Sequence, residues 1–433
     1  MPPSDSVSWM RQASRFIRAH RQKTFVIHLN GDLLASVLIE EVAEDLLLLA
    51  GLGVKLVLVH GARPQIDAAC RAHDPAATPA FVNDIRITHG ELFGAVKQAI
   101  LSCRAGLEAK LARAALDTVE RNATIPIVGG TFVIARPKGV VAGQDTGFAG
   151  EIRRIDSEAI NHCLADHSIV LLSPLAYSSS GEAYNMNSLE LAMTVASELH
   201  ANKLIVLSDK TLSGDQDSAP VRQLTLKQAR ELEPADPALA RLLNVAIKAC
   251  QGGVQRTHIV NYQNSGALLE ELFTRDGSGT LISDTPFDRL RAATIDDIGG
   301  ILALIEPLEA MGLLVKRSRE KLEMEIDHFQ VMVREGTVVA CGALYEFDNG
   351  TAAEIACIAV HEDYRGNEFG AALVNALEQR ARAEGVTNVF VLTTGATGWF
   401  EELGYQRVSL DELPVERQAL YNYQRNSVVL RKS

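Results

Sequence analysis

The alternation of short apolar runs with helical stretches over residues 24–262 constrains the fold of this chain more than any other feature. Apolar runs at 25–29 and 55–60 flank a helical stretch at 37–49. Further apolar runs follow at residues 125–128, 168–173, 203–208 and 257–262. Strands joined by helices pair in parallel, and helices then cover both faces of the sheet. The pattern therefore predicts an α/β fold with a mainly parallel sheet, whose ligands bind at the carboxyl ends of its strands.

The order of elements changes near Ser283-Asp284-Thr285-Pro286. Two helical stretches follow at 296–311 and 318–327, and strands come after them at 329–334 and 338–347. This order predicts a second domain of the α+β class with a mostly antiparallel sheet. A chain of 433 residues also exceeds the size to which one core usually grows. We expect three parts, an N-terminal helix at 1–20, an α/β domain at 21–284 and an α+β domain at 285–433.

The N-terminal stretch carries apolar side chains at helical spacing. Trp9, Ala13, Phe16, Ile17 and His20 recur with the period of a helix, which predicts an amphipathic helix ahead of the first strand. Docking onto its own domain and packing against a partner subunit fit this pattern equally well. A position on a membrane surface fits it less well.

Charge and cysteine content exclude several functional classes. Lys and Arg number 42 against 54 Asp and Glu, and the formal net charge of −12 argues against a general binder of nucleic acid or anionic membranes. None of the six cysteines belongs to a C-x-x-C pair, which disfavours a zinc site or a disulfide framework. The longest apolar run is too short to cross a bilayer, and no signal peptide is recognisable. We expect a cytoplasmic protein with no metal site.

A strand, a turn and a helix in the C-terminal part carry the strongest chemical signal. The apolar strand at 352–360 is followed by a turn at 361–371 that contains Arg365, and then by a helix. A helix N-terminus gathers free backbone N–H groups, which suit a pyrophosphate, and Arg365 adds a positive charge. Taken alone, such a turn is more often an ordinary connection between a strand and a helix.

The wider context resembles the acetyl-CoA motif of the GNAT acetyltransferase superfamily, because Trp399-Phe400-Glu401-Glu402-Leu403-Gly404-Tyr405 follows the next strand at the family's spacing. The resemblance implies that acetyl-CoA is the co-substrate, with no permanently bound cofactor. It places the pantetheine arm on the main chain of Cys357, Ile358, Ala359 and Val360. It places the pyrophosphate on Arg365, Gly366, Asn367, Glu368, Phe369 and Gly370. The family usually has glycine where Glu368 stands, so we expect this side chain to point away from the phosphates.

Three further segments resemble the bacterial N-acetylglutamate synthase family, and the likeness extends over essentially the whole chain. They are residues 291–301, 314–320 and 420–427. The resemblance implies transfer of an acetyl group to L-glutamate, as in the first step of arginine biosynthesis. It assigns glutamate binding to Leu314, Lys316, Arg317, Arg425 and Ser427. Guanidinium groups suit the two carboxylates of this substrate. For any one cation alone, the alternative is a solvated surface side chain.

Acetyl transfer needs a neutral amine and donors for the thioester oxygen, so a general base must take a proton from the substrate ammonium. Glu354 is the candidate base, and the main-chain N–H of Cys357 is the candidate oxyanion donor. A solvent-facing carboxylate is the alternative for Glu354. An acyl-enzyme on the Cys357 thiol is disfavoured, because no His or Lys lies beside it in the sequence to activate it. The proton donor for the CoA thiolate stays open among Thr393, Thr394, Tyr405 and Tyr423.

The segment Val59-His60-Gly61-Ala62-Arg63-Pro64-Gln65-Ile66-Asp67 resembles the glycine-rich turn of the amino acid kinase family. The resemblance implies the fold of that family for the α/β domain. Phosphoryl transfer needs lysines that neutralise the transferring group. His28 and Asn30 replace the family's lysine and glycine in the first strand, and Leu242 takes the place of the second lysine. We therefore expect a kinase-like scaffold without phosphoryl transfer.

Residues 258–280 resemble the arginine-binding region of arginine-sensitive acetylglutamate kinases, which also carry an extra N-terminal helix. The resemblance implies L-arginine as an allosteric effector, with Glu271 and a carbonyl near Gly277 as its contacts, and a homo-oligomer, a hexamer by resemblance. A solvated helix face ending in a glycine-rich cap is the alternative for each residue. Two rival functions remain, an acetylglutamate kinase with an accessory acetyltransferase-like module and a non-catalytic arginine-sensing scaffold.

Overall fold

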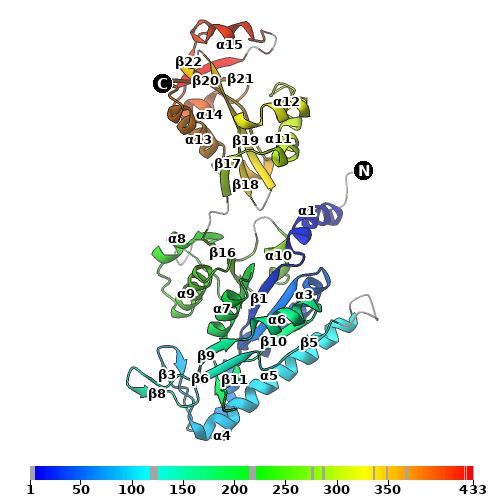
Figure 1. Cartoon of the computed structure of the whole chain (residues 1–433), viewed down its shortest axis with the longest axis vertical. Helices are drawn as coiled ribbons and strands as arrows, with labels where there is room; N and C mark the ends of the chain where they lie inside the picture. The colour runs from blue at the N-terminus through cyan, green and yellow to red at the C-terminus, as the bar shows by residue number, and fades with distance from the viewer. Residues whose placement is uncertain are drawn as a thin grey trace. The chain divides into compact units, whose positions relative to one another are not determined.

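The computed structural model describes residues 5–117, 125–213, 221–274, 277–284, 288–334, 337–347, 350–365, 369–423, 425 and 427–432. Contacts between residues divide the chain into two compact units, Met1–Thr285 and Pro286–Ser433. We describe each unit by itself (Figure 1).

An eight-stranded sheet forms the centre of the N-terminal unit. Its strands, in spatial order, are β14 (Gln223–Thr225), β16 (Thr280–Ser283), β15 (Arg256–Asn261), β13 (Lys203–Ser208), β1 (Thr24–Leu29), β2 (Lys55–His60), β10 (Ile169–Leu172) and β5 (Ile127–Val128). Every neighbouring pair is parallel except β15 and β16, which are antiparallel. The predicted mainly parallel sheet is therefore confirmed.

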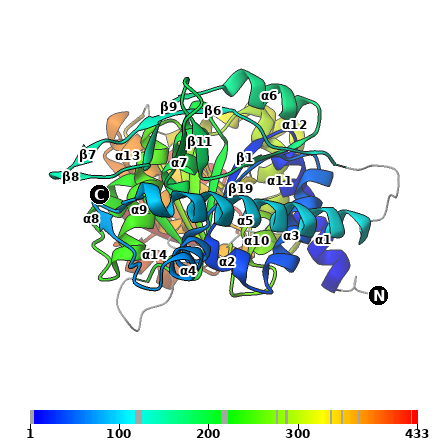
Figure 2. The ribbon, with the colours of Figure 1, turned by 90° about the horizontal axis from the view of Figure 1, so that it is seen from below.

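Helices cover both faces of this sheet, because alternate strand residues point to opposite sides. Phe25 and Ile27 of β1 join the core on one face, and Val26 joins the core on the other. The first face is covered by α1 (Asp5–His20), α3 (Ile39–Gly51), α5 (Gly90–Asp117) and α10 (Ala267–Phe273). The second face is covered by α6 (Ser157–Ala165), α7 (Ser188–Glu198) and α9 (Pro237–Gln251). Figure 2 shows α5 as one long helix with α4 (Arg63–His73) beside it.

The N-terminal unit also contains short strands that the sequence pattern did not reveal. They form a four-stranded sheet of β12 (Ala183–Asn185), β11 (Leu175–Tyr177), β6 (Val133–Pro137) and β9 (Gly150–Ile155), and two small hairpins. Most of these strands are too short to show a clear period. Their polar and apolar residues also follow no strict alternation, as in the Glu151 to Arg154 stretch of β9.

The N-terminal helix α1 docks onto its own unit. Ala13, Phe16 and His20 are buried, and His20 Nε2 lies 2.8 Å from the Leu272 carbonyl oxygen in α10. Trp9 and Met10 are exposed, at 47% and 58% of their surface. The face that includes Phe16 is therefore part of this unit's own core.

The C-terminal unit is built on a seven-stranded sheet. Its strands, in spatial order, are β17 (Asp288–Ala292), β18 (Phe329–Arg334), β19 (Thr337–Phe347), β20 (Ala352–Val360), β21 (Asn388–Thr393), β23 (Val428–Lys432) and β22 (Gln406–Val408). All neighbouring pairs are antiparallel except β20 and β21. Figure 1 shows α11 (Ile298–Ala310) and α12 (Arg319–Met324) on one side of this sheet and α13 (Phe369–Ala383) on the other. The expected α+β architecture is confirmed.

Within the described part of the chain, no helix combines the length and the apolar character needed to cross a membrane.

Candidate functional site

The two parallel strands of the C-terminal sheet separate part of the way along. Only Ala352, Ala353 and Glu354 of β20 are in register with β21. From Ile355 to Val360, β20 continues along β19 on its other edge but is no longer in register with β21. Main-chain N–H and C=O groups on this open edge can pair with an extended ligand, as in strand addition. The predicted pantetheine contacts, Cys357 to Val360, all lie on this segment.

A β-bulge at Cys357 accompanies the separation. Cys357 has a φ of +56°, and the register with β19 shifts between Cys341 and Ala343. Gly342 lies at the shift, and a Cβ there would lie 2.5 Å from Ile358 Cδ1, so a larger residue fits only if the Ile358 side chain moves. A left-handed φ at a residue other than glycine is costly and often marks a functional position. The bulge shifts the alternation of the strand, so that Ile355 and Ile358 both pack on the α13 side while Cys357 joins the core on the α11 side.

The Cys357 side chain is not set up as a nucleophile. It is buried, and burial raises the pKa of its thiol to about 11, although the nearby Arg317 charge acts in the opposite direction. A thiol with this pKa is protonated at neutral pH, and the thiolate is the reactive form. The geometry therefore favours direct transfer over an acyl-enzyme.

The turn after β20 leads into the N-terminus of α13. Arg365 is exposed, and its backbone N–H donates to the Glu362 carbonyl oxygen at 3.2 Å. Phe369 is buried, and a Cβ on Gly370 would lie 3.0 Å from the Trp399 ring. The predicted phosphate contacts Gly366, Asn367 and Glu368 lie outside the described residues.

Glu354 is buried and held by an arginine. Arg417 of α15 (Val415–Ala419) donates from Nε to Glu354 Oε2 at 2.5 Å and from Nη2 to Oε1 at 3.1 Å. Only 11% of the Glu354 side chain and 16% of the Arg417 side chain are exposed. The alternative of a solvent-facing carboxylate is therefore wrong. Tyr345 of β19 is the cross-strand neighbour of Glu354.

Arg317 lies on the α11 side of the sheet, next to Cys357 and Tyr345. Its Nη1 donates to the Val315 carbonyl oxygen at 3.2 Å, but its buried Nε has no hydrogen-bond partner among the described residues. The Tyr345 hydroxyl donates to Glu325 at 2.8 Å, and burial raises the pKa of Tyr345. An unmatched buried N–H group on a guanidinium is a ready donor for an anionic ligand.

Arg425 joins the C-terminal segment to the loop that carries Arg317. Its Nη2 donates to the carbonyl oxygens of Leu313 at 2.8 Å and Gly312 at 3.3 Å. Its Nε is buried and, within the described part of the chain, also lacks a partner. Leu314 of this loop is half-buried, while Lys316 is exposed. Ser427 is half-buried, and its carbonyl oxygen accepts from the Tyr421 hydroxyl at 2.7 Å.

The four candidate proton donors differ in their surroundings. Tyr405 is 2% exposed and donates to Glu378 at 3.0 Å within the α13 core, and burial raises its pKa. Tyr423 is 74% exposed. Thr393 ends β21, where its hydroxyl accepts from the Ala396 N–H at 3.0 Å, and Thr394 is exposed. Because the Tyr405 hydroxyl donates to Glu378, it is not available to the CoA thiolate. Thr393, Thr394 and Tyr423 stay as candidate proton donors.

In the N-terminal unit, histidines occupy the carboxyl ends of the neighbouring strands β1 and β2. Burial lowers the pKa of His28 and of His60 to about 4, so both are neutral at pH 7. His28 Nε2 lies 3.0 Å from the Ser188 hydroxyl, and His60 Nε2 lies 2.9 Å from the Ser173 hydroxyl. Leu242 packs among apolar side chains. These positions offer no positive charge to a phosphoryl group.

Glu271 of α10 belongs to a buried chain of three titratable side chains. The Lys203 ammonium can only donate, so its 3.1 Å contact makes His258 Nε2 an acceptor and leaves the Nδ1–H of His258 to bond Glu271 Oε1 at 2.5 Å. The backbone N–H groups of Ser278 and Gly279 donate to Oε2 at 2.8 and 2.7 Å. Burial alone would raise the pKa of Glu271, but these hydrogen bonds lower it overall.

The Gly277 carbonyl oxygen, the other predicted arginine contact, accepts from Arg222 Nη1 at 3.3 Å. A carboxylate has about four acceptor sites, so three donors leave roughly one free on Glu271. The structure brings Glu271 and Gly277 together, since a Cβ on Gly277 would lie 2.4 Å from Glu271 Oε2. Their role in arginine binding stays a prediction.

Comparison with known proteins identifies the family. The profile of the Amino acid kinase family matches residues 23–261, and that of the Acetyltransferase (GNAT) family matches residues 304–405. The chain is 44% identical to the amino-acid acetyltransferases of Ectopseudomonas mendocina and Pseudomonas aeruginosa, over 99% of this chain and 99% of each relative. The chain belongs to the amino-acid acetyltransferase family. The resemblances to the GNAT superfamily and to the amino acid kinase family are thereby confirmed.

Solved structures agree with this assignment. The crystal structure of N-acetylglutamate synthase from Neisseria gonorrhoeae complexed with coenzyme A and L-arginine is 36% identical, with a TM-score of 0.91 and 98% of both chains covered. A second structure of the same enzyme, complexed with coenzyme A and N-acetyl-glutamate, matches with a TM-score of 0.64 over the same share.

Sequence reasoning missed three side chains next to residues that it had proposed. Arg417 pairs with Glu354, and Lys203 and His258 form the buried chain with Glu271. His258 opens the segment that resembles an arginine-binding region, which was a usable signal. Arg417 gave none, because its partner lies 63 residues away in the sequence.

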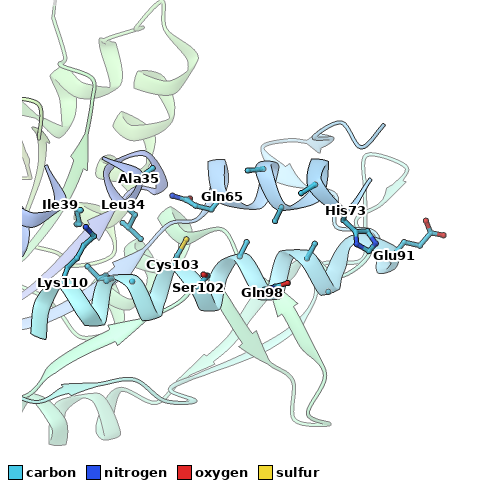
Figure 3. A pocket seen from close by; sticks show the side chains of 18 residues that line it. Leu34, Ala35, Ile39, Gln65, His73, Glu91, Gln98, Ser102, Cys103 and Lys110 are labelled. Carbon is cyan, nitrogen blue, oxygen red and sulfur yellow. The ribbon is translucent and has the colours of Figure 1, made fainter. Parts of the chain in front are cut away.

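A wide pocket of about 1000 Å³ lies between α4 and α5 and does not have the chemistry of this site (Figure 3). Its lining consists mostly of small side chains, among them Ala68, Ala72 and Ala95. Lys110 lies at one end, and His73 and Glu91 lie at the other. Dicarboxylate binding needs converging cations, which this lining lacks.

Proposed function

We propose that the chain transfers the acetyl group of acetyl-CoA to the amino group of L-glutamate, giving N-acetyl-L-glutamate and CoA, and that L-arginine regulates this reaction. The observation that carries the proposal is the open edge of β20, which begins directly after the buried Glu354. Two guanidinium groups of adjoining segments, those of Arg317 and Arg425, have buried Nε atoms without a partner among the described residues. The relatives' names and the ligands of the N. gonorrhoeae enzyme support it.

Acetyl-CoA binds along β20 and the turn after it. The main chain of Cys357, Ile358, Ala359 and Val360 pairs with the pantetheine arm. The pyrophosphate is held by Arg365 and by backbone groups of Gly366, Asn367, Glu368, Phe369 and Gly370 at the start of α13. Helix α13 is 15 residues long, from Phe369 to Ala383. Its N-terminus therefore carries the partial positive charge of a helix dipole, which favours the pyrophosphate.

Glutamate binds through its two carboxylates. Arg317 and Arg425 each offer a buried Nε–H that has no partner within the described part of the chain. Charge-assisted hydrogen bonds from guanidinium to carboxylate are among the stronger ones in proteins. Lys316 adds positive charge, Ser427 adds a hydroxyl, and Leu314 packs against the methylene groups.

Glu354 accepts a proton from the substrate ammonium, directly or through one water. The freed amine attacks the thioester carbon, and the Cys357 N–H stabilises the oxyanion that forms. As the tetrahedral intermediate collapses, the C–S bond breaks, the C–N bond is kept, and the attacking nitrogen loses its second proton to solvent. The CoA thiolate leaves and takes up one proton from a donor that stays unassigned.

Arginine regulation belongs to the N-terminal unit. The guanidinium of the effector contacts Glu271 and the carbonyl near Gly277, beside Lys203 and His258. These residues lie outside the unit that carries Glu354. We further propose a homo-oligomer, a hexamer by family resemblance, and a cytoplasmic location.

Replacing Glu354 with Gln tests the catalytic assignment. Glu354→Gln should lower kcat by about 10²- to 10⁴-fold, because the amide keeps the shape but cannot accept the proton. The KM for acetyl-CoA should stay nearly unchanged. Glu346→Gln, an exposed carboxylate on neighbouring β19, is the matched control and should keep parental turnover. Parental activity in Glu354→Gln would contradict the assignment of Glu354 as the general base.

A further inference from the structure

We propose that Arg417 is a positioning residue that keeps Glu354 ionised and correctly oriented for proton acceptance. This inference rests on the proposed function, because it concerns the carboxylate that the function uses as a base.

The first argument is the geometry of the pair. Nε and Nη2 of Arg417 bond different oxygens of Glu354, at 2.5 and 3.1 Å. A planar fork that engages both oxygens fixes the plane of the carboxylate as well as its position. Each oxygen keeps a second acceptor site, so the fork leaves room for a bridging water or an ammonium.

The second argument is burial. Because Glu354 is 8% exposed, an ionised carboxylate at this position would be costly without a counter-charge. A buried Glu without a partner takes up a proton instead, and a protonated carboxyl cannot serve as a base. The charge of Arg417 therefore supports the basic function of Glu354.

The third argument comes from the other groups around Glu354. On β19, Tyr345 is its cross-strand neighbour, but the Tyr345 hydroxyl donates to Glu325. On β20, the Cys357 thiol is protonated, and Arg317 lies next to Cys357 and Tyr345. Among the described residues, Arg417 is the cation that the structure places in direct contact with both Glu354 oxygens.

Arg417 also stands on a separate element, so its position is set independently of β20. It belongs to the short helix α15, and its backbone N–H donates to the Pro414 carbonyl oxygen at 2.8 Å. Glu354 is fixed by the β19 and β21 ladders. The pair thus ties the 414–419 segment to the strand that carries the base.

The test compares Arg417→Gln and Arg417→Lys with the parent in kcat/KM for glutamate from pH 6 to pH 9. Arg417→Gln should lower kcat. The acid side of its pH–rate profile should also move to higher pH, so that this variant loses about tenfold more activity at pH 6 than at pH 8. Arg417→Lys keeps a charge without the fork and should recover part of both losses. Arg407→Gln, which breaks an exposed pair with Glu401, is the control and should follow the parental profile.

Two outcomes would overturn the inference. One is an equal loss at every pH in both Arg417 variants, which is the signature of a purely structural role. The other is a raised KM for glutamate with an unmoved acid side of the pH–rate profile, which would make Arg417 a substrate ligand. Arg417→Lys keeps the test decisive if Arg417→Gln does not fold. Absence of glutamate-dependent CoA release in the parent protein would instead remove the proposed function itself.

Discussion

Arg425 connects two segments that lie 112 residues apart in the sequence, because its Nη2 donates to the Leu313 carbonyl oxygen. The Nε of the same side chain is buried and has no hydrogen-bond partner among the described residues. One guanidinium thus both shapes the loop that carries Arg317 and takes part in the proposed recognition of glutamate. We therefore expect that a positive charge alone cannot replace the Arg425 guanidinium.

Arg425→Ala should raise the KM for glutamate by about ten- to a hundredfold, since a charge-assisted hydrogen bond contributes roughly 1.5–3 kcal/mol. Arg425→Lys should recover only a small part, because an ammonium lacks the second donor of the fork. Steady-state kinetics with each substrate varied in turn provide the measurement. An equal rise in the KM values for glutamate and acetyl-CoA would contradict the assignment and make Arg425 a structural residue.

The sequence could reveal residue types at the site but not all of their partners. The resemblance placed Arg317 and Arg425 at the glutamate site, and the structure places both around one loop. The left-handed φ of Cys357 could not be predicted, because nothing in the sequence distinguishes this cysteine from its neighbours in the strand. The ion pair with Arg417 depends on tertiary packing, which local sequence patterns do not encode.

At the scale of elements, the start of α11 is held in place by an ion pair between the buried Asp297 and the half-buried Arg291. Arg291 of β17 donates to Asp297 from both terminal nitrogens, at 2.6 and 2.9 Å. The backbone N–H and the hydroxyl of Thr294 also donate to Asp297. The Arg291 guanidinium is the largest of the influences that lower the pKa of Asp297 to about 2.

Asp297→Asn should destabilise the protein by about 2 kcal/mol at pH 7, and the difference should vanish near pH 2. The folded-state pKa lies below the unfolded value of about 4, so the stabilisation is present above pH 4 and is lost as pH falls from about 4 to about 2. The measurement is denaturant-induced unfolding at several pH values, with the free energy of unfolding taken from the transition of the C-terminal unit. Asp296→Asn, at an exposed neighbour, is the control. An equal effect at pH 7 and pH 2.5 would contradict the linkage.

Long apolar strands were predicted better than short polar ones. The predicted strand at 352–360 has the same bounds in the structure, and the runs of the parallel sheet agree within two residues. The four-stranded sheet that contains β6 and β9 was not foreseen, because its short strands lack a clear alternation. The spacing of apolar residues predicts strands and helices that bury one face or both. It carries little information about short, polar strands.

At the scale of the whole molecule, the two units have separate cores and separate proposed sites. Glu271 belongs to the N-terminal unit and Glu354 belongs to the C-terminal unit. If arginine binds at its proposed contacts, it can alter acetyl transfer only by favouring one state of the protein over another, since those contacts include no residue proposed for catalysis. Regulation and chemistry should therefore be separable by mutation.

Glu271→Gln should abolish or strongly weaken the response to arginine and leave the activity without arginine nearly unchanged. The amide weakens the hydrogen bond from His258 and removes the charge proposed to meet the guanidinium. Initial rates over a range of arginine concentrations provide the measurement. Glu270→Gln, an exposed neighbour on α10, is the control. An unchanged arginine response in Glu271→Gln would place the effector elsewhere.

The most direct test of the account is the release of CoA from acetyl-CoA by the purified full-length chain, followed with a thiol reagent. The account predicts release that depends on L-glutamate and changes when L-arginine is added. Aspartate should be a poor substitute, because its side-chain carboxylate is one methylene short of the cations. The account also predicts no ATP-dependent phosphorylation of N-acetylglutamate. Equal release with glutamate and an unrelated apolar amino acid, or phosphorylation at an enzymatic rate, would contradict it.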